Sequence, residues 1–258
     1  ENSTTYGDSS TASGSNSAAF GFKSTASGGD STSIGKASSA TQQGATALGH
    51  LAHATGVRST ALGTGSKANA SCSLAVGWKA NATAINATAI GYTANAVGIN
   101  STAIGTSALA GNNYASSFGS KASATGLASM ALGAGSTANA TGAITTGVNS
   151  IASGANSSAF GTGAIASEED AIAVGYFSKA SGNDSIAIGK SAVASASNST
   201  AIGTDSEASG ENSTVIGDSA TASGDNSSAF GFAAVSSNLN TTAIGYGTEA
   251  SGVNAIAI

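Results

Sequence analysis

The stretch Asn100-Ser-Thr-Ala-Ile-Gly105 recurs without change at residues 198–203, 98 residues further along, which is seven times 14. Every fourteenth residue counted from Ile104, in both directions and without an insertion, is large and mostly apolar, with Thr146 as the exception. A period kept this strictly is typical of a solenoid, in which each repeat forms one coil stacked on the next. We number the positions of each repeat from this residue, so that Ile104 is position 0.

The remaining positions of the repeat predict two short strands and two turns per coil. Position +1 is Gly in all 18 complete repeats, position +6 is Ala in all but one, and position +10 is Asn or Asp in 12 of 18. Gly and Asn are typical of turns because they tolerate a positive φ. One strand then runs through residues 101–104 and the other through residues 108–110. The fold class predicted is an all-β parallel β-roll, a solenoid of 14-residue coils.

Composition supports this interpretation and excludes several others. Charged residues make up 8% of the chain, against about 25% in ordinary soluble domains, and proline is absent. A chain without proline suits strands that all need their N–H groups for pairing. The net charge of −5 argues against nucleic-acid binding. No apolar run approaches the ~18 residues of a membrane helix, so we expect no membrane insertion of this segment.

The charged residues also indicate which positions are covered. All 21 avoid positions −2, −1, 0, +1, +4 and +6, which predicts that these six positions are buried. We expect positions −2 and 0 to face the interior of the coil, opposite +4 and +6. Position −1, which is Ala in 14 of 19 cases, would then face outward. An outward column that is apolar requires cover, so we expect the chain to associate with copies of itself through the first strand.

These residues resemble a known family. Segments 100–105 and 198–203, with close variants at 16–21, 156–161, 212–217 and 226–231, are similar to the head repeat of YadA-like trimeric autotransporter adhesins, roughly Asn-Ser-Val-Ala-Ile-Gly. No repeat here has Val in the third place of an otherwise perfect motif. The motif residues that match are Asn100, Ser101, Ala103, Ile104, Gly105, Asn198, Ser199, Ala201, Ile202 and Gly203.

The resemblance implies a left-handed β-roll and a homotrimer displayed on the surface of a Gram-negative bacterium. In that family the head binds host matrix proteins such as collagen. We expect residues 1–258 to form a single head domain of about 18 repeats. Because the chain starts and stops within the pattern, we also expect it to be a fragment of a longer protein. Its neck, stalk and outer-membrane anchor would lie outside this sequence.

The sequence offers little catalytic or metal-binding chemistry. His50 and His53 lie three residues apart at positions +2 and +5, and a metal site would need further ligands than these and the distant Cys72. Residues 168–170, Glu-Glu-Asp, fall in one turn, where a solvated acidic turn is a simpler interpretation than a Ca²⁺ site. We therefore predict no enzyme activity, no cofactor and no metal.

Aromatic residues concentrate at two positions of the repeat. Those at position 0 are expected in the core. Those at position +2 either pack on a neighbouring chain, which we favour, or are exposed as binding anchors. The position +2 aromatics are Phe22, Trp78, Tyr92, Tyr176, Phe232 and Tyr246.

The function we predict is an adhesin head that attaches to host cells or extracellular matrix through many weak contacts, multiplied by trimerisation. Charge is uneven, with +3 on residues 1–129 and −8 on residues 130–258. The imbalance either orients the head toward charged partners or keeps it soluble, which is the simpler explanation.

One alternative to the adhesin function is an ice-binding β-solenoid, although its Thr column at position −2 is interrupted and placed inward here. Another is a passive spacer within a surface fibre.

Overall fold

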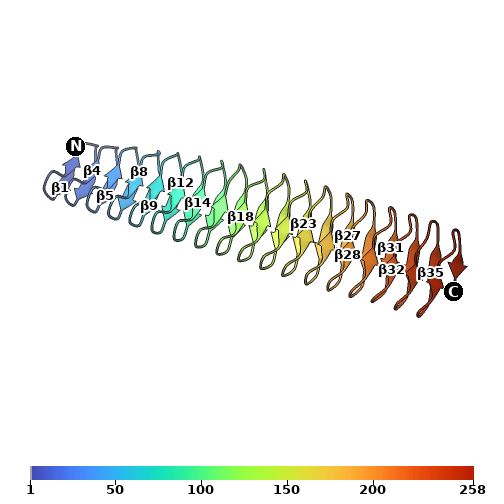
Figure 1. Ribbon diagram of the computed structural model, residues 1–258. Helices are drawn as coiled ribbons and strands as arrows, with labels where there is room; N and C mark the ends of the chain where they lie inside the picture. The colour runs from blue at the N-terminus through green and yellow to red at the C-terminus, as the bar shows by residue number, and fades with distance from the viewer. Residues whose placement is uncertain (1) are drawn as a thin grey trace. The chain divides into compact units, whose positions relative to one another are not determined.

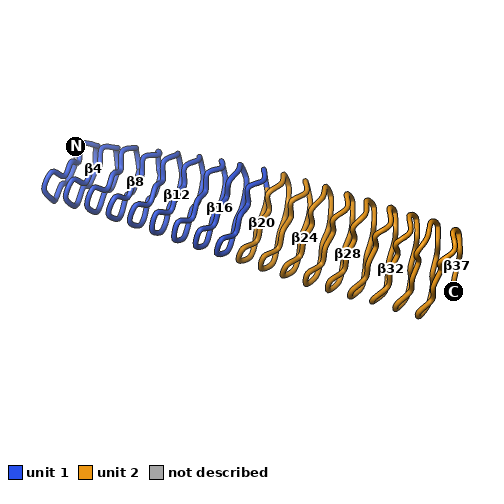
Figure 2. The backbone as a smooth tube through the Cα atoms, viewed as in Figure 1, with its two compact units in different colours: residues 1–128 blue, residues 129–258 orange. Residues whose placement is uncertain are grey.

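The computed structural model describes residues 2–258 and divides the chain into two compact units (Figure 2). Unit 1 is Glu1–Ala128 and unit 2 is Ser129–Ile258. Within each unit the chain repeats the same 14-residue coil with two short strands per coil (Figure 1). The predicted all-β parallel solenoid is confirmed in both units.

In unit 1 the three-residue strands occupy positions −2 to 0 and form a parallel sheet, sheet A. They are β1 (Thr4–Tyr6), β3 (Ala18–Phe20), β5 (Thr32–Ile34), β7 (Thr46–Leu48), β9 (Thr60–Leu62), β11 (Leu74–Val76), β13 (Thr88–Ile90), β15 (Thr102–Ile104) and β17 (Ser116–Phe118). The two-residue strands at positions +5 and +6 form sheet B. They are β2 (Thr11–Ala12), β4 (Thr25–Ala26), β6 (Ser39–Ala40), β8 (His53–Ala54), β10 (Lys67–Ala68), β12 (Asn81–Ala82), β14 (Asn95–Ala96), β16 (Leu109–Ala110) and β18 (Ser123–Ala124).

Unit 2 has a sheet A and a sheet B of the same kind. Its sheet A strands are β19 (Met130–Leu132), β21 (Ile144–Thr146), β23 (Ser158–Phe160), β25 (Ile172–Val174), β27 (Ile186–Ile188), β29 (Thr200–Ile202), β31 (Thr214–Ile216), β33 (Ser228–Phe230), β35 (Thr242–Ile244) and β37 (Ile256–Ala257). Its sheet B strands are β20 (Thr137–Ala138), β22 (Ile151–Ala152), β24 (Ile165–Ala166), β26 (Lys179–Ala180), β28 (Val193–Ala194), β30 (Glu207–Ala208), β32 (Thr221–Ala222), β34 (Val235–Ser236) and β36 (Glu249–Ala250).

The strands within each unit pair in parallel and in strict register with the repeat. Each strand residue lies beside the residue 14 places later, as Ala89 does beside Ala103 in unit 1 and Ala187 beside Ala201 in unit 2. A one-residue slip would turn every side chain to the opposite face of the sheet. The register therefore stacks like on like and makes each position of the repeat a continuous column.

Two turns close each coil, and their backbone explains the Gly and Asn columns. Throughout residues 2–258, positions +3 and +10 have φ between +50° and +68°, and the Gly at position +1 has φ between +125° and +154°. The amide of Ala108 donates to the carbonyl of Gly105 at 3.3 Å, and Ala115 donates in the same way to Asn112 at 3.2 Å. Both are four-residue turns with a positive φ at the third residue, as type II turns require. The predicted positive φ is confirmed at positions +1 and +10, and position +3, which the sequence did not single out, shares it.

The interior of each coil is built from small side chains. Away from the two ends of the chain, positions −1, +4, +6 and +11 are buried and hold almost only Ala and Ser, and the largest fully buried side chain among the described residues is Val215. Two sheets separated by methyl and hydroxymethyl groups lie too close together to admit Ile, Leu or Phe between them. The large residues therefore lie on the outside of the coil.

Hydroxyl groups in this interior close the turns. Ser31 Oγ donates to the carbonyl of Gly28 and Ser157 Oγ to that of Gly154, each at 2.7 Å. Ser33 and Ser38 bond to each other across the interior at 2.8 Å. Because a buried hydroxyl is costly without a partner, these bonds allow serine to alternate with alanine in the core.

Candidate interaction faces

The outer side of sheet A in each unit carries two columns of side chains, a large and mostly apolar one at position 0 and a column of mainly Thr, Ser and Ile at position −2. We call this side the apolar face. Ile34, Leu48 and Ile244 at position 0 have 39%, 41% and 41% of their surface exposed. Neighbouring coils add the next large side chain directly alongside, since the strands are in register. Apolar side chains gathered in a continuous column on a surface mark an interaction site more often than single exposed ones do.

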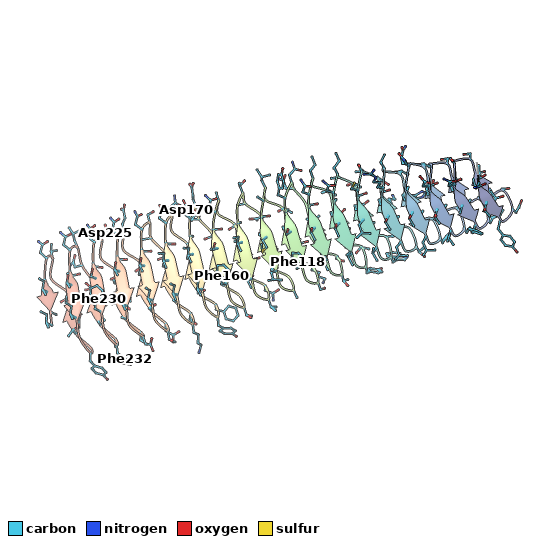
Figure 3. All side chains as sticks on the ribbon, turned by 180° about the vertical axis from the view of Figure 1, so that it is seen from behind. Phe118, Phe160, Asp170, Asp225, Phe230 and Phe232 are labelled. Atoms are coloured by element: carbon cyan, nitrogen blue, oxygen red, sulfur yellow. The ribbon has the colours of Figure 1, made fainter. Side chains whose placement is uncertain are left out.

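This face corrects the predicted direction of the first strand. Positions −2 and 0 were expected inside and position −1 outside, but the structure has Ala103 and Ala201 fully buried while Ile104 and Ile202 point outward. The physical reason is volume, because the interior between +4, +6 and +11 has room only for alanine-sized groups. The aromatics at position 0, predicted as core, also lie outside, as Phe230 and Phe160 do in unit 2 (Figure 3).

Each residue of the two head-motif copies has a definite place in this geometry. Ser101 and Ser199 are fully buried at position +11, next to the turn. Asn100 and Asn198 are exposed in the turn with φ near +55°. Gly105 and Gly203 follow the strand with φ of +135° and +138°. The motif therefore encodes one turn end, one strand with alternating faces, and the start of the next turn.

Asparagines at position +10 also bond from coil to coil. Asn86 Nδ2 donates to Asn100 Oδ1 at 2.9 Å in unit 1, and Asn240 donates to Asn254 at the same distance in unit 2. A short amide side chain both tolerates the left-handed backbone and continues the ladder. This double role accounts for the frequency of Asn in that column.

The position +2 aromatics lie exposed on one turn edge of the coils. Figure 3 shows Phe232 on this edge of unit 2, with Asp170 and Asp225 on the opposite edge. Trp78 stacks on Tyr92 with ring centroids 4.6 Å apart and planes within 9°, and Phe232 stacks on Tyr246 at 5.3 Å. Tyr176 contacts Phe177 edge-to-face at 4.4 Å. Phe22, the sixth of these residues, is exposed beside Lys23. That these rings pack on a neighbouring chain, with ligand binding as the alternative, stays a prediction.

The other residues singled out from the sequence lie apart from one another. His50 is exposed in a turn and His53 is half-buried on the outside of β8. Glu168, Glu169 and Asp170 are exposed in one turn, and Cys72 is exposed in another. Within residues 2–258, no three His, Cys, Asp or Glu side chains gather as metal ligands would, and the surface has no pocket. The same residues include no helix long and apolar enough to cross a membrane.

Sequence reasoning missed the apolar face, although a signal for it was present. Four positions of the repeat hold almost only small residues, and four small side chains facing one another leave no volume for a fifth that is large. Comparing the volumes of opposed columns would have placed position 0 outside. The avoidance of charge at position 0 reflects an apolar outer face.

The chain was compared with known proteins. The family model of the YadA head domain repeat, which spans two copies, matches residues 12–38, 26–52, 40–66, 54–80, 73–94, 82–108, 96–122, 146–167, 152–178, 166–192, 180–206, 208–234 and 236–258. These matches cover well over half of the sequence, and the chain belongs to the YadA head domain family. That family is one of adhesin domains and is not an enzyme family.

Two other comparisons were made, one with curated protein sequences and one with solved structures. No curated protein sequence matches the chain. Among solved structures, the collagen-binding domain of the Yersinia adhesin YadA is similar, with 22% identity over 74% of this chain and 68% of that one and a TM-score of 0.24. The family assignment rests on the repeat matches.

Proposed function

We propose that the chain is the head of a bacterial surface adhesin that assembles as a homotrimer and attaches to host cells or extracellular matrix. The observation that carries the assembly is the apolar face of sheet A. Membership of the YadA head family supports the threefold number, the adhesive role and display at the outer membrane, with the anchor in regions outside this sequence. We also propose that the two units belong to one head domain.

The thin interior gives a physical reason for assembly. Each coil buries only alanine- and serine-sized groups, while its larger apolar side chains remain in contact with water. Burying apolar surface contributes roughly 25 cal/mol per Å², so packing the apolar faces of three copies together adds the core that one chain lacks. Sheet B has a more polar outer side, with Lys67, Glu207 and Glu249 at position +5. Sheet A is therefore the side that faces the copies.

Assembly also supplies the adhesive strength that a pocketless surface needs. Every coil repeats the same exposed turn positions, and a trimer presents each of them three times. Linked weak contacts bind far more strongly together than singly, because the later contacts form within one complex. A ligand that is itself extended and repetitive, such as a matrix protein, suits such a surface.

The assembly is tested by molar mass in solution with two matched variants. Ile188 lies on the apolar face and Ile151 on the outer side of sheet B, and they are exposed to 38% and 37%. We expect the parent to have the mass of three chains, Ile188→Glu to lower that mass, and Ile151→Glu to leave it unchanged. An interface charge would be desolvated without a partner and repeated three times around one axis. A monomeric parent, or equal behaviour of the two variants, contradicts the proposed interface.

Adhesion itself is tested by binding of the purified chain to cultured host cells and to surfaces coated with matrix proteins. The assembled parent is expected to bind and the Ile188→Glu variant to bind much more weakly, because it loses multivalency. An assembled chain that binds none of these surfaces would favour the passive spacer instead.

The ice-binding alternative gains no support from the surface. The Thr column at position −2 faces outward, contrary to the expectation from sequence, but its neighbour at position 0 is apolar. No three-residue strand in residues 2–258 carries Thr at both outward positions. A measurement of thermal hysteresis on the parent separates this alternative from adhesion.

A further inference from the structure

One turn edge of unit 1 concentrates positive charge. Four of its six basic residues lie at positions +2 and +3, together with the exposed His50, and Asp8 is the one acidic residue at these positions in this range. We call this surface the basic edge. Its lysines are Lys23, Lys36, Lys79 and Lys121, and all four are exposed.

The basic edge is a row and not a cluster. Coils of parallel strands stack at about 4.8 Å, and Lys23 and Lys121 lie seven coils apart, so the row extends over roughly 34 Å. A compact anion reaches one or two of these lysines at a time. A linear polyanion lying along the edge reaches all of them.

Aromatic rings hold two of these ammonium groups in place. Lys79 Nζ lies 4.2 Å from the centre of the Trp78 ring, and Lys23 Nζ lies 5.2 Å from that of Phe22. A cation–π contact fixes the position of a lysine without neutralising its charge, so the ammonium groups remain available to a ligand. Holding them in place also lowers the entropy lost on binding.

We propose that the basic edge binds a linear sulfated polysaccharide. This names a ligand class for the proposed adhesin and so rests on that proposal. Sulfate esters are charged at all physiological pH values and repeat along the chain, which complements a row of lysines. Burying the same edge against a copy would desolvate unpaired cations, because the opposite turn edge of unit 1 carries a single acidic residue, Asp30, and also a basic one, Arg58.

The aromatic geometry favours a sulfated glycan over a single-stranded nucleic acid. Nucleic acids bind such surfaces by stacking bases on open ring faces. Trp78 has Tyr92 stacked against it and the Lys79 ammonium over its ring, and the two cannot share one face. Both faces of Trp78 are therefore occupied, and the ring acts as a support for the cation.

Unit 2 serves as an internal comparison. The same turn edge there holds Lys190 together with Asp205 and Asp218, which gives it a net negative charge. Aromatic residues are present on this turn edge in both units, but only in unit 1 do they lie beside a row of lysines. The proposed binding is therefore a property of unit 1.

The test measures binding of a fluorescent heparin oligosaccharide to the full chain by anisotropy, using two double variants of equal charge. Lys36→Thr/Lys79→Ser removes two charges from the basic edge, and Arg58→Asn/Lys67→Thr removes two from elsewhere on unit 1. Each new residue already occupies the same position in other coils, as Thr64, Ser107, Asn100 and Thr11 do, so folding is preserved. Circular dichroism and molar mass confirm this for each variant.

We expect the edge variant to bind about tenfold more weakly and the control variant to lose less than about twofold. Raising NaCl from about 50 to about 300 mM should weaken parent binding at least about tenfold, as screening of a row of charges requires. Equal losses in the two variants, no binding at low salt, or equally tight binding of a thymidine oligonucleotide would each overturn the inference. If the parent assembles and binds cells or matrix but not heparin, only the ligand class fails and the adhesin proposal stands.

Discussion

Gly35 lies so close to Gly49 in the next coil that a Cβ atom on Gly35 would stand 2.6 Å from the Gly49 carbonyl oxygen. Gly35 also has a φ of +130°, which side chains other than hydrogen rarely allow. Position +1 is therefore restricted twice, by its own backbone and by the neighbouring coil. The same approach recurs in other coils of both units, as at Gly21 and Gly203, whereas Gly245 near the C-terminus keeps only the positive φ.

The first prediction follows directly from this contact. Gly35→Ala should lower the free energy of unfolding by more than about 1 kcal/mol, because the backbone of two coils must shift. Chemical denaturation followed by circular dichroism measures the loss.

A glycine in the same coil provides the control. Gly44 has a φ of +65°, and a Cβ atom there would meet only Arg58, at ordinary contact distances of 3.5 Å from its Cγ and 3.8 Å from its Cα. Gly44→Asn places the residue most frequent at position +10 in a conformation it tolerates, so stability should be unchanged or slightly higher. If both variants lose equal stability, close packing of the coils does not account for the Gly column.

The second prediction concerns buried hydroxyl groups. Ser117 is fully buried at position −1, and its Oγ has no hydrogen-bond partner. Ser117→Ala should therefore raise the free energy of unfolding by about 1 kcal/mol, since the uncompensated desolvation of the hydroxyl is removed. The comparison variant is Ser31→Ala, which deletes a buried bond of 2.7 Å to Gly28 and should reduce stability by about the same amount. Opposite signs in paired denaturation curves are the expected result, and a destabilised Ser117→Ala would contradict it.

Most of the fold could be predicted from the sequence because a strict period constrains every coil at once. The interval from Ile104 to Ile202 fixed the coil length, and Gly105 and Asn100 located the turns. The direction of the strand could not be predicted from polarity, because Ala103 and Ile104 are both apolar and neither column carries charge. Only the volume available between the sheets distinguishes them.

The candidate surfaces were predicted less completely, for a related reason. Position in the repeat placed Trp78 and Tyr92 in the same column, but their stacking and the ammonium of Lys79 over the indole depend on side-chain conformations. Comparing the net charges of residues 1–129 and 130–258 also did not show that four lysines share one turn edge. Assigning each charge to a turn or a strand face is the step that reveals the row.

The third prediction separates the two roles of Asn at position +10. Asn100→Gly keeps the left-handed backbone but removes the bond from Asn86, so it should cost about 0.5–1 kcal/mol. Asn100→Ala removes both and should cost roughly 1 kcal/mol more, the penalty for alanine at positive φ. Urea denaturation of the two variants and the parent gives the values. Equal stability of Gly and Ala at residue 100 would mean that the backbone conformation is not what selects Asn.

The last prediction uses two neighbouring residues on opposite faces of β29. Ala201 is fully buried inside the coil and Ile202 faces outward on the apolar face. Ala201→Glu places a carboxylate where only a methyl group fits, so it should disrupt the coil and lower the β signal in circular dichroism. Ile202→Glu should keep that signal and lower the molar mass measured by light scattering, because its charge lies on the face that we propose to pack against the other copies. Glu207, already on the outer side of sheet B, shows that an outward carboxylate is compatible with the coil. If Ala201→Glu keeps its β signal and only dissociates, position −1 faces the copies after all, and the inside and outside of the first strand must be exchanged.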